Sequence, residues 1–164
     1  MTQKKRVLAA GLIAAILLIV IDQATKYLAQ TGLAGKRGVT LIPGVFELFY
    51  LENTGAAFGM FDQKQWFFVF IALVMAVASA YVYLRLPQDG HYHALRVICV
   101  LIAAGALGNM IDRVVHHYVI DFLYFSLIDF PVFNVADCYV CVGTAAAVVL
   151  LFTVYRDDSF EFLR

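Results

Sequence analysis

Long apolar stretches alternate with short polar segments along this chain. Four stretches of 15 to 19 residues contain no charged side chain: residues 7–21, 66–84, 97–111 and 138–155. An α-helix needs about 20 residues to cross the roughly 30 Å hydrocarbon core of a bilayer. The pattern therefore predicts four transmembrane helices, near residues 7–27, 66–85, 94–114 and 137–156.

The segment between the first two predicted helices is rich in glycine and in β-branched and aromatic residues. Residues 39–42 and 45–51 are typical of strands, and the Pro43-Gly44 pair between them favours a turn. We predict a single domain over residues 1–164, an α-helical membrane protein with four transmembrane helices. Its small extracytoplasmic β-sheet is expected within residues 28–65.

Residues 115–136, between the last two predicted helices, are strongly aromatic, which is typical of a membrane interface. Pro131 disfavours helix at the residue before it, so we expect an extended connection. Asp121 follows the third predicted helix, and Asp137 begins the fourth. Antiparallel helices joined by a short link have neighbouring ends, so we expect both aspartates close together near the outer interface.

Composition supports the membrane assignment. The chain has 164 residues and is 63% hydrophobic, whereas soluble domains are nearer half. A formal net charge of zero gives no reason to expect a nucleic-acid partner. By the positive-inside rule, the basic residues that flank the predicted helices place both termini in the cytoplasm. These residues are Lys4, Lys5, Arg6, Arg85, Arg96 and Arg156.

The beginning of the chain also has the basic and apolar regions of a signal peptide, so one alternative is that it is cleaved. The apolar run continues past Ile21 into Asp22, Gln23 and Lys26 without a small-x-small cleavage pattern. We therefore expect the first helix to be retained.

Carboxylates beside hydrocarbon are costly, so Asp121 and Asp137 require an explanation. Two carboxylates a few ångströms apart cannot both ionise easily, and one keeps a proton near neutral pH. The ionised one can take a proton from water while the other polarises a peptide carbonyl. We therefore predict an aspartic peptidase. Asp137, in the first turn of a helix, is expected as the base and Asp121 as the acid.

Each polar feature also has a structural interpretation. Asn134 and Asp137 have the spacing of a helix N-cap and an acid three positions later, which could explain both without catalysis. Asp121 has no comparable explanation, because its neighbours Ile120 and Phe122 are apolar. Residues 53–59 fit a simple turn.

Two pairs of residues spaced by four lie on single helix faces. Asp22 and Lys26 fit an ion pair with Lys26 extending to the outer surface, or the support of a polar site. Asn109 and Arg113 fit a packed helix end, with Arg113 extending to the surface, or groups that hold a substrate backbone or a lipid carbonyl. The small residues at 103–108 allow close helix packing.

Other chemistries find less support. The chain has no G-x-S-x-G and no H-E-x-x-H motif, and we expect neither a metal nor a cofactor. Cys138 and Cys141 form a C-x-x-C, which we interpret as apolar packing. A thiol oxidoreductase is an alternative, but it would need a second exposed pair, and only Cys99 remains. A proton-coupled transporter is another alternative, although the chain has no internal repeat.

Five short motifs resemble the bacterial lipoprotein signal peptidases, also called signal peptidase II. They occur in the family's order across nearly the whole chain; Ala104 stands where many members have glycine, and Cys138 and Cys141 are outside the pattern. The motifs are Asp22-Gln23-x-Thr25-Lys26, Asn53-x-Gly55-Ala56-Ala57-Phe58, Gly105-x-x-Gly108-Asn109-x-x-Asp112-Arg113, Val119-x-Asp121-Phe122 and Phe133-Asn134-x-Ala136-Asp137.

The resemblance implies an intramembrane aspartic endopeptidase that cleaves prolipoproteins just before a cysteine carrying a diacylglyceryl group. Its catalytic residues would be Asp121 and Asp137, with Asp22, Lys26 and Asp112 in support. The positions that match the family's substrate-binding and globomycin-binding site are Asn53, Gly55, Gly105, Asn109, Arg113, Asn134 and Ala136.

The resemblance also implies a multi-pass protein of the bacterial cytoplasmic membrane, with the active site near the extracytoplasmic face. Besides prolipoproteins, we expect contacts with membrane lipids, no nucleic acid and a monomer.

Overall fold

A computed structural model describes residues 2–55 and 64–155 of the chain. Two features of the sequence fall outside these ranges. They are Ala56, Ala57 and Phe58 of the second motif, and Arg156 of the basic residues that predict the orientation.

Four long helices form the bulk of the described chain: α1 (Gln3–Leu33), α2 (Gln65–Arg85), α3 (His93–His116) and α4 (Val135–Thr153). All four are long and apolar enough to span a membrane, which confirms the predicted fold class. Two short 3₁₀ helices, η2 (Gly90–Tyr92) and η3 (Ser126–Ile128), lie in the connections. α1 ends at Leu33 rather than near residue 27. Its polar residues at 22 and 26 find partners on other elements, so they do not interrupt the helix.

A three-stranded antiparallel sheet accompanies the helices, in the order β1 (Val39–Ile42), β2 (Phe46–Asn53) and β3 (Val119–Tyr124). The first two strands and the turn between them are confirmed, and Gly44 in that turn has a φ of 69°. The third strand lies outside residues 28–65, in the segment that we predicted as an extended connection. Its first four residues are all buried, so it lacks the alternation by which a half-buried strand is recognised.

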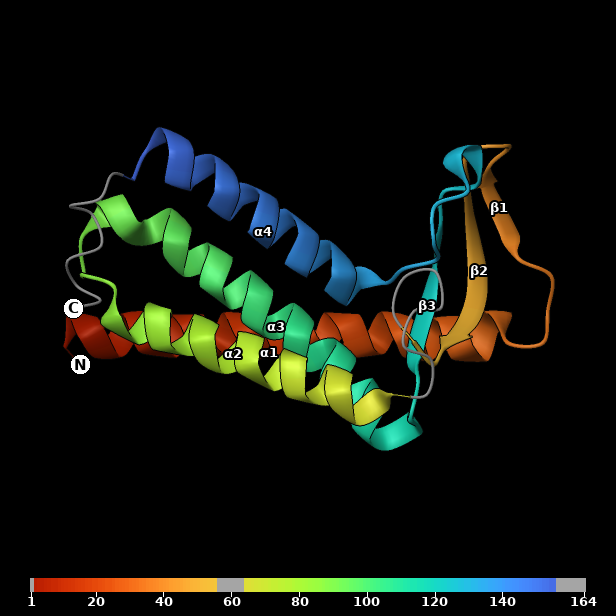
Figure 1. Ribbon diagram of the computed structural model, residues 1–164, viewed down its shortest axis with the longest axis horizontal. Coiled ribbons are helices and arrows are strands. Elements are labelled where there is room, and N and C mark those ends of the chain that lie inside the picture. Colours follow the sequence, from red (N-terminus) through yellow and green to blue (C-terminus); the bar gives the residue numbers. More distant parts are fainter. Residues whose placement is uncertain (1, 56–63, 156–164) are drawn as a thin grey trace.

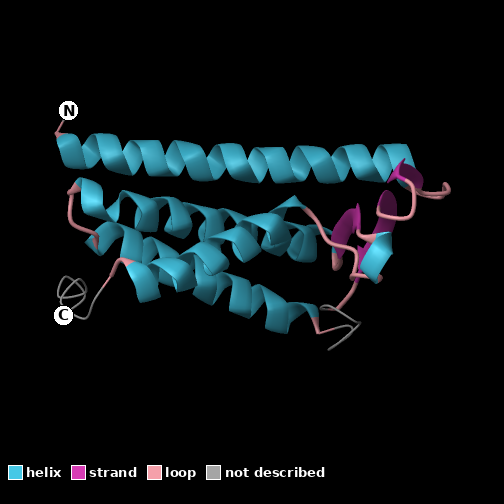
Figure 2. Cartoon of the chain, turned by 90° about the horizontal axis from the view of Figure 1, so that it is seen from above, coloured by secondary structure: helices cyan, strands magenta, loops and turns pink. Residues whose placement is uncertain are grey.

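The helices run side by side with α3 in the centre, packed against the other three. Because successive helices alternate in direction, the beginning of α1 and the end of α4 lie at one end of the bundle (Figure 1). The sheet lies at the opposite end, beside the last turns of α1 (Figure 2). Ala29 and Leu33 of α1 join Ile120 and Phe122 of β3 in one apolar cluster there.

Near the sheet, the interior of this bundle contains buried polar side chains, whereas its exterior is apolar. Among the described residues, the largest side chains that are fully buried are all polar or charged: Lys26, Asn134, Asp22, Asp112 and Asp121. Large apolar side chains such as Leu17, Phe70 and Val149 are more than half exposed, as expected of surfaces that face lipid. The polar interior lies near the sheet end of the bundle and defines the candidate site.

Candidate active site

Three charged side chains from α1 and α3 meet in the interior. Lys26 Nζ lies 2.9 Å from Asp22 Oδ2 and 3.0 Å from Asp112 Oδ2, and all three residues are at most 1% exposed. The predicted ion pair is therefore present, but the expectation that Lys26 extends to the outer surface is wrong. Lys26 stays in the interior because the carboxylate of Asp112 on α3 lies within its reach and because α1 continues beyond this point.

Gln23 belongs to the same cluster, and the sequence analysis assigned it no role. Its amide nitrogen donates to Asp112 Oδ1 at 2.9 Å and to the Gly108 carbonyl at 3.2 Å. The remaining oxygen of Asp22 accepts from the backbone N–H of Ala136 at 2.9 Å. The cluster thus ties α1 to α3 and to the start of α4. The sequence could have indicated this role of Gln23, because Gln23 lies beside Asp22 in the first motif.

Asn109 connects this cluster to Asp137. Its side-chain oxygen accepts from Lys26 Nζ at 2.8 Å and from Asn134 Nδ2 at 3.1 Å, while its own amide donates to Asp137 Oδ1 at 2.7 Å. An ammonium group can only donate, so Lys26 fixes the direction of the Asn109 amide. In the structure this amide therefore contacts Asp137, whereas we had offered it as a donor to the substrate.

The start of α4 is a capping box, as the spacing of Asn134 and Asp137 predicted. The backbone N–H of Asp137 donates to Asn134 Oδ1 at 3.0 Å, and the backbone N–H of Asn134 donates to Asp137 Oδ2 at 3.1 Å. The same Asn134 donates from its amide to Asp121 Oδ1 at 2.6 Å. The cap and the link between the two aspartates therefore share one residue.

Asp121 approaches this point from β3 and is 2% exposed. Its other oxygen accepts from Asn53 Nδ2 of β2 at 2.7 Å. Burial raises the pKa of Asp121 to about 7, and the nearby charge of Asp137 adds to the increase, while the amides of Asn53 and Asn134 oppose it. Such a carboxyl group is partly protonated at neutral pH.

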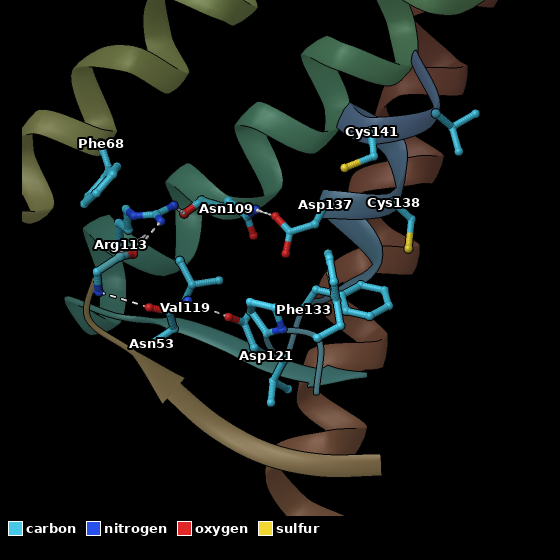
Figure 3. A pocket seen from close by; sticks show the side chains of 15 residues that line it. Asn53, Phe68, Asn109, Arg113, Val119, Asp121, Phe133, Asp137, Cys138 and Cys141 are labelled. Carbon is cyan, nitrogen blue, oxygen red and sulfur yellow. Dashed lines mark hydrogen bonds between the residues drawn. The ribbon is translucent and has the colours of Figure 1, made fainter. Parts of the chain in front are cut away.

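A cavity of about 600 Å³ opens between β3, α3 and α4, and Asp121 and Asp137 both line it (Figure 3). Asn53, Gly55 and Arg113 contribute to its wall, as does Asn109. Of the other expected binding positions, Gly105 lines an adjoining cavity of about 210 Å³. Asn134 and Ala136 are fully buried behind the wall.

Arg113 lies across the cavity from the aspartates and does not extend to the surface as the structural interpretation had it. Its guanidinium stacks 4.8 Å from the centre of the Phe68 ring, with long hydrogen bonds to the carbonyls of Asn109 and Gly55, at 3.4 and 3.5 Å. Its Nε is buried and has no hydrogen-bond partner among the described residues. The group therefore retains donor capacity.

The structure also adds residues that the sequence analysis missed. Cys138 and Cys141, interpreted as packing residues, line the cavity of the two aspartates, as do Phe68, Phe130 and Phe133. The signal was available for Cys141, because it follows Asp137 by four residues on α4 and so lies on the same helix face. The phenylalanines come from segments that only the fold brings together.

Comparisons with known proteins agree on one family. A family model described as signal peptidase (SPase) II matches residues 14–153. A lipoprotein signal peptidase of Symbiobacterium thermophilum is 46% identical over 151 residues, covering 91% of this chain and 98% of the relative. One of Streptococcus pyogenes is 35% identical over 157 residues, covering 96% and 98%.

Two solved structures share the fold. A structure described as a bacterial membrane enzyme superposes with a TM-score of 0.79 at 31% identity, covering 93% of this chain and 92% of that one. A second, with the same description, superposes with a TM-score of 0.76, also at 31% identity, and covers 90% and 95%.

Proposed function

Because the chain belongs to the signal peptidase II family, we propose that it is an aspartic endopeptidase that removes the signal peptide from prolipoproteins. The observation that carries the proposal is the convergence of Asp121 and Asp137 on one cavity, joined through Asn134. Two carboxylates that reach one cavity from a strand and a helix can share a proton and activate a water molecule.

The division of roles follows from the surroundings of the two carboxylates. Both oxygens of each carboxylate accept N–H donors, so the hydrogen bonds alone do not distinguish Asp121 from Asp137. Asp137 lies in the first turn of α4, whose positive end favours the ionised form of its carboxylate. Asp121, with a pKa raised to about 7, carries a proton in part of the molecules at neutral pH. Asp137 is therefore the base and Asp121 the acid in the resting enzyme.

The reaction then proceeds in two steps. Asp137 takes a proton from water as the water oxygen bonds to the scissile carbonyl carbon, and Asp121 gives its proton to the carbonyl oxygen. In the second step the C–N bond breaks, the leaving amine receives the proton held by Asp137, and Asp121 recovers its own. The products are a signal peptide with a new carboxyl end and a lipoprotein with a new amino end.

The walls of the cavity fit a substrate that is partly lipid. Apolar residues form much of the lining, including Val119, Phe130, Phe133 and Val142. We propose that cleavage occurs just before a cysteine with a diacylglyceryl group, whose chains remain against these apolar walls and the surrounding lipid. Arg113, with its spare donor capacity, would bind a carbonyl of the substrate backbone.

The remaining site residues serve this arrangement in different ways. Asn53, Asn109 and Asn134 orient the aspartates, and the buried ion cluster of Asp22, Lys26 and Asp112 supports Asn109 and the start of α4. Gly105 and Gly108 carry no side chain that would crowd their neighbours. Gly55 and Ala136 act through the backbone: the Gly55 carbonyl accepts from Arg113, and the Ala136 N–H donates to Asp22.

The chain is a multi-pass bacterial membrane protein. We propose that both of its termini lie in the cytoplasm and that the cavity lies near the extracytoplasmic face of the cytoplasmic membrane. We further propose that it acts as a monomer surrounded by lipid, since one chain carries both aspartates.

A gel-shift assay with purified enzyme and a diacylglyceryl prolipoprotein tests the function. Asp121→Asn and Asp137→Asn should each reduce cleavage by at least about a hundredfold, because each removes a proton-transfer group. The matched control is Asp129→Asn, since Asp129 is exposed in a left-handed conformation that asparagine tolerates. Near-normal turnover by either of the two aspartate variants, with the control also active, would contradict the catalytic assignment.

A further inference from the structure

The thiols of Cys138 and Cys141 are the reactive groups of the cavity that the proposed reaction does not use. Both line the cavity of the two aspartates, Cys141 is exposed, and Cys138 is partly exposed. Figure 3 shows both side chains on the α4 side of the cavity, beside Asp137. The five motifs of the resemblance end at Asp137 and do not include them.

The position of Cys141 relative to Asp137 is set by helix geometry. Residues four apart on a helix have their Cβ atoms about 5–6 Å from one another on the same face. Cys141 also lines the adjoining cavity with Gly105 and Phe68, so this residue borders both cavities. A group attached there would occupy the space between Asp137 and the aromatic side chain of Phe68.

We propose that Cys141 is a covalent modification site through which a soft electrophile that enters the cavity stops peptide cleavage. This proposal rests on the proposed function. With a maleimide, the sulfur forms a bond to one alkene carbon, and the thiol proton ends on the neighbouring carbon. No group leaves and nothing is oxidised. The bulky adduct then excludes the scissile peptide from Asp137.

The third cysteine provides an internal reference. Cys99 is buried on α3 and packs with Leu86, Leu95, Ile98 and Tyr155, in the apolar cluster at the other end of the bundle. It carries the same functional group without access to the cavity. We expect it to remain unmodified while the protein is folded.

The first part of the test measures modification without any reference to activity. The full chain in detergent is treated with N-ethylmaleimide at mildly alkaline pH, since the thiolate is the reacting form, and the adducts are located by peptide mass mapping. Cys141 should react first and Cys138 more slowly. Cys99 should react only after denaturation. Absence of an adduct at Cys141 under conditions that label all three residues in the denatured chain would overturn the proposal.

The second part compares cleavage before and after treatment for each variant separately. Treated wild-type enzyme should lose nearly all activity, and so should treated Cys99→Ala and Cys138→Ala. Treated Cys141→Ala should keep most of the activity that it had before treatment. Complete labelling of Cys141 with cleavage unchanged would overturn the proposal.

The two proposals fail in different ways. If the untreated wild-type enzyme does not cleave a prolipoprotein, the proposed function is wrong, whatever the labelling shows. If the untreated enzyme cleaves but Cys141 does not react, or reacts without effect, the proposed function stands and the modification site is wrong.

Discussion

Three asparagine side chains determine how the two carboxylates are held. The side-chain oxygen of each one accepts from a group that can only donate. These groups are the backbone N–H of Gly55 for Asn53, the ammonium of Lys26 for Asn109 and the backbone N–H of Asp137 for Asn134. Each amide nitrogen therefore must point to an aspartate oxygen. The two aspartates are therefore oriented by asparagine side chains whose amides cannot flip.

Substitution of Asn53 tests this arrangement through pH dependence. The Asn53 hydrogen bond lowers the pKa of Asp121, which burial and Asp137 raise to about 7. The proposed acid must be protonated, so activity is lost as pH rises through that pKa. Asn53→Ala should therefore move the alkaline limb of the cleavage rate to higher pH, by about one unit for a hydrogen bond to a charged group.

The shift in pH profile separates this effect from a general loss of activity. Thr40→Ala, an exposed position on the outer strand β1, should leave the limb where it is. An Asn53→Ala enzyme whose alkaline limb is unchanged, or moves to lower pH, would show that Asp121 is not the titrating acid.

At the level of elements, one glycine of α3 allows three helices to meet. A Cβ atom at Gly108 would lie 2.6 Å from Asp22 Oδ2 and 3.3 Å from the Cβ of Ala136. Asp22 cannot move aside easily, because it is held by Lys26 and by the backbone of α4. The approach of α1, α3 and α4 thus depends on the missing side chain.

Gly108→Ala should therefore lower the free energy of unfolding by about 1–3 kcal/mol, the usual cost of overpacking. Its matched control is Gly32→Ala on α1, where an added Cβ meets nothing within 4 Å. That change should be neutral or stabilising by up to about 1 kcal/mol, since alanine favours helix. Thermal unfolding in detergent measures both. Equal melting temperatures for the two variants would contradict this account of the contact.

Local patterns predicted the helices and two strands because each of these elements shows its own periodicity or turn residues. The fold class and the capping box at Asn134 followed from such patterns. β3 did not, since it pairs with residues about 70 positions earlier, as Leu51 with Asp121, and is buried on both faces. The burial of Lys26 also required knowledge of a partner on another helix, Asp112, which spacing along α1 cannot supply.

On the scale of the whole molecule, the sheet and the connection between α2 and α3 lie at opposite ends of the bundle (Figure 1). If both termini are cytoplasmic, the sheet is outside the cell membrane and that connection is inside. Thr40 on β1 and Gln88 in the connection are both exposed. A cysteine introduced at either position would therefore report on which side of the membrane that position lies.

We predict that a membrane-impermeant maleimide added to intact spheroplasts labels Thr40→Cys and leaves Gln88→Cys unlabelled. Both substitutions are made in a chain whose native cysteines are replaced by alanine. Permeabilised cells supply the control, in which both positions should be labelled. The reverse pattern in intact spheroplasts would invert the proposed orientation and place the cavity at the cytoplasmic face.

The helices differ in length, and as a consequence the rate of the reaction should depend on the thickness of the bilayer. α1, with 31 residues, is about 46 Å long, whereas α4, with 19, is about 28 Å and just matches a hydrocarbon core of roughly 30 Å. The first turn of α4 holds Asp137, so a bilayer thickened by a few ångströms would draw this carboxylate below the headgroups, away from the water that it must activate. The acyl-chain length of the surrounding lipids would then change the turnover of the enzyme without any change in its side chains.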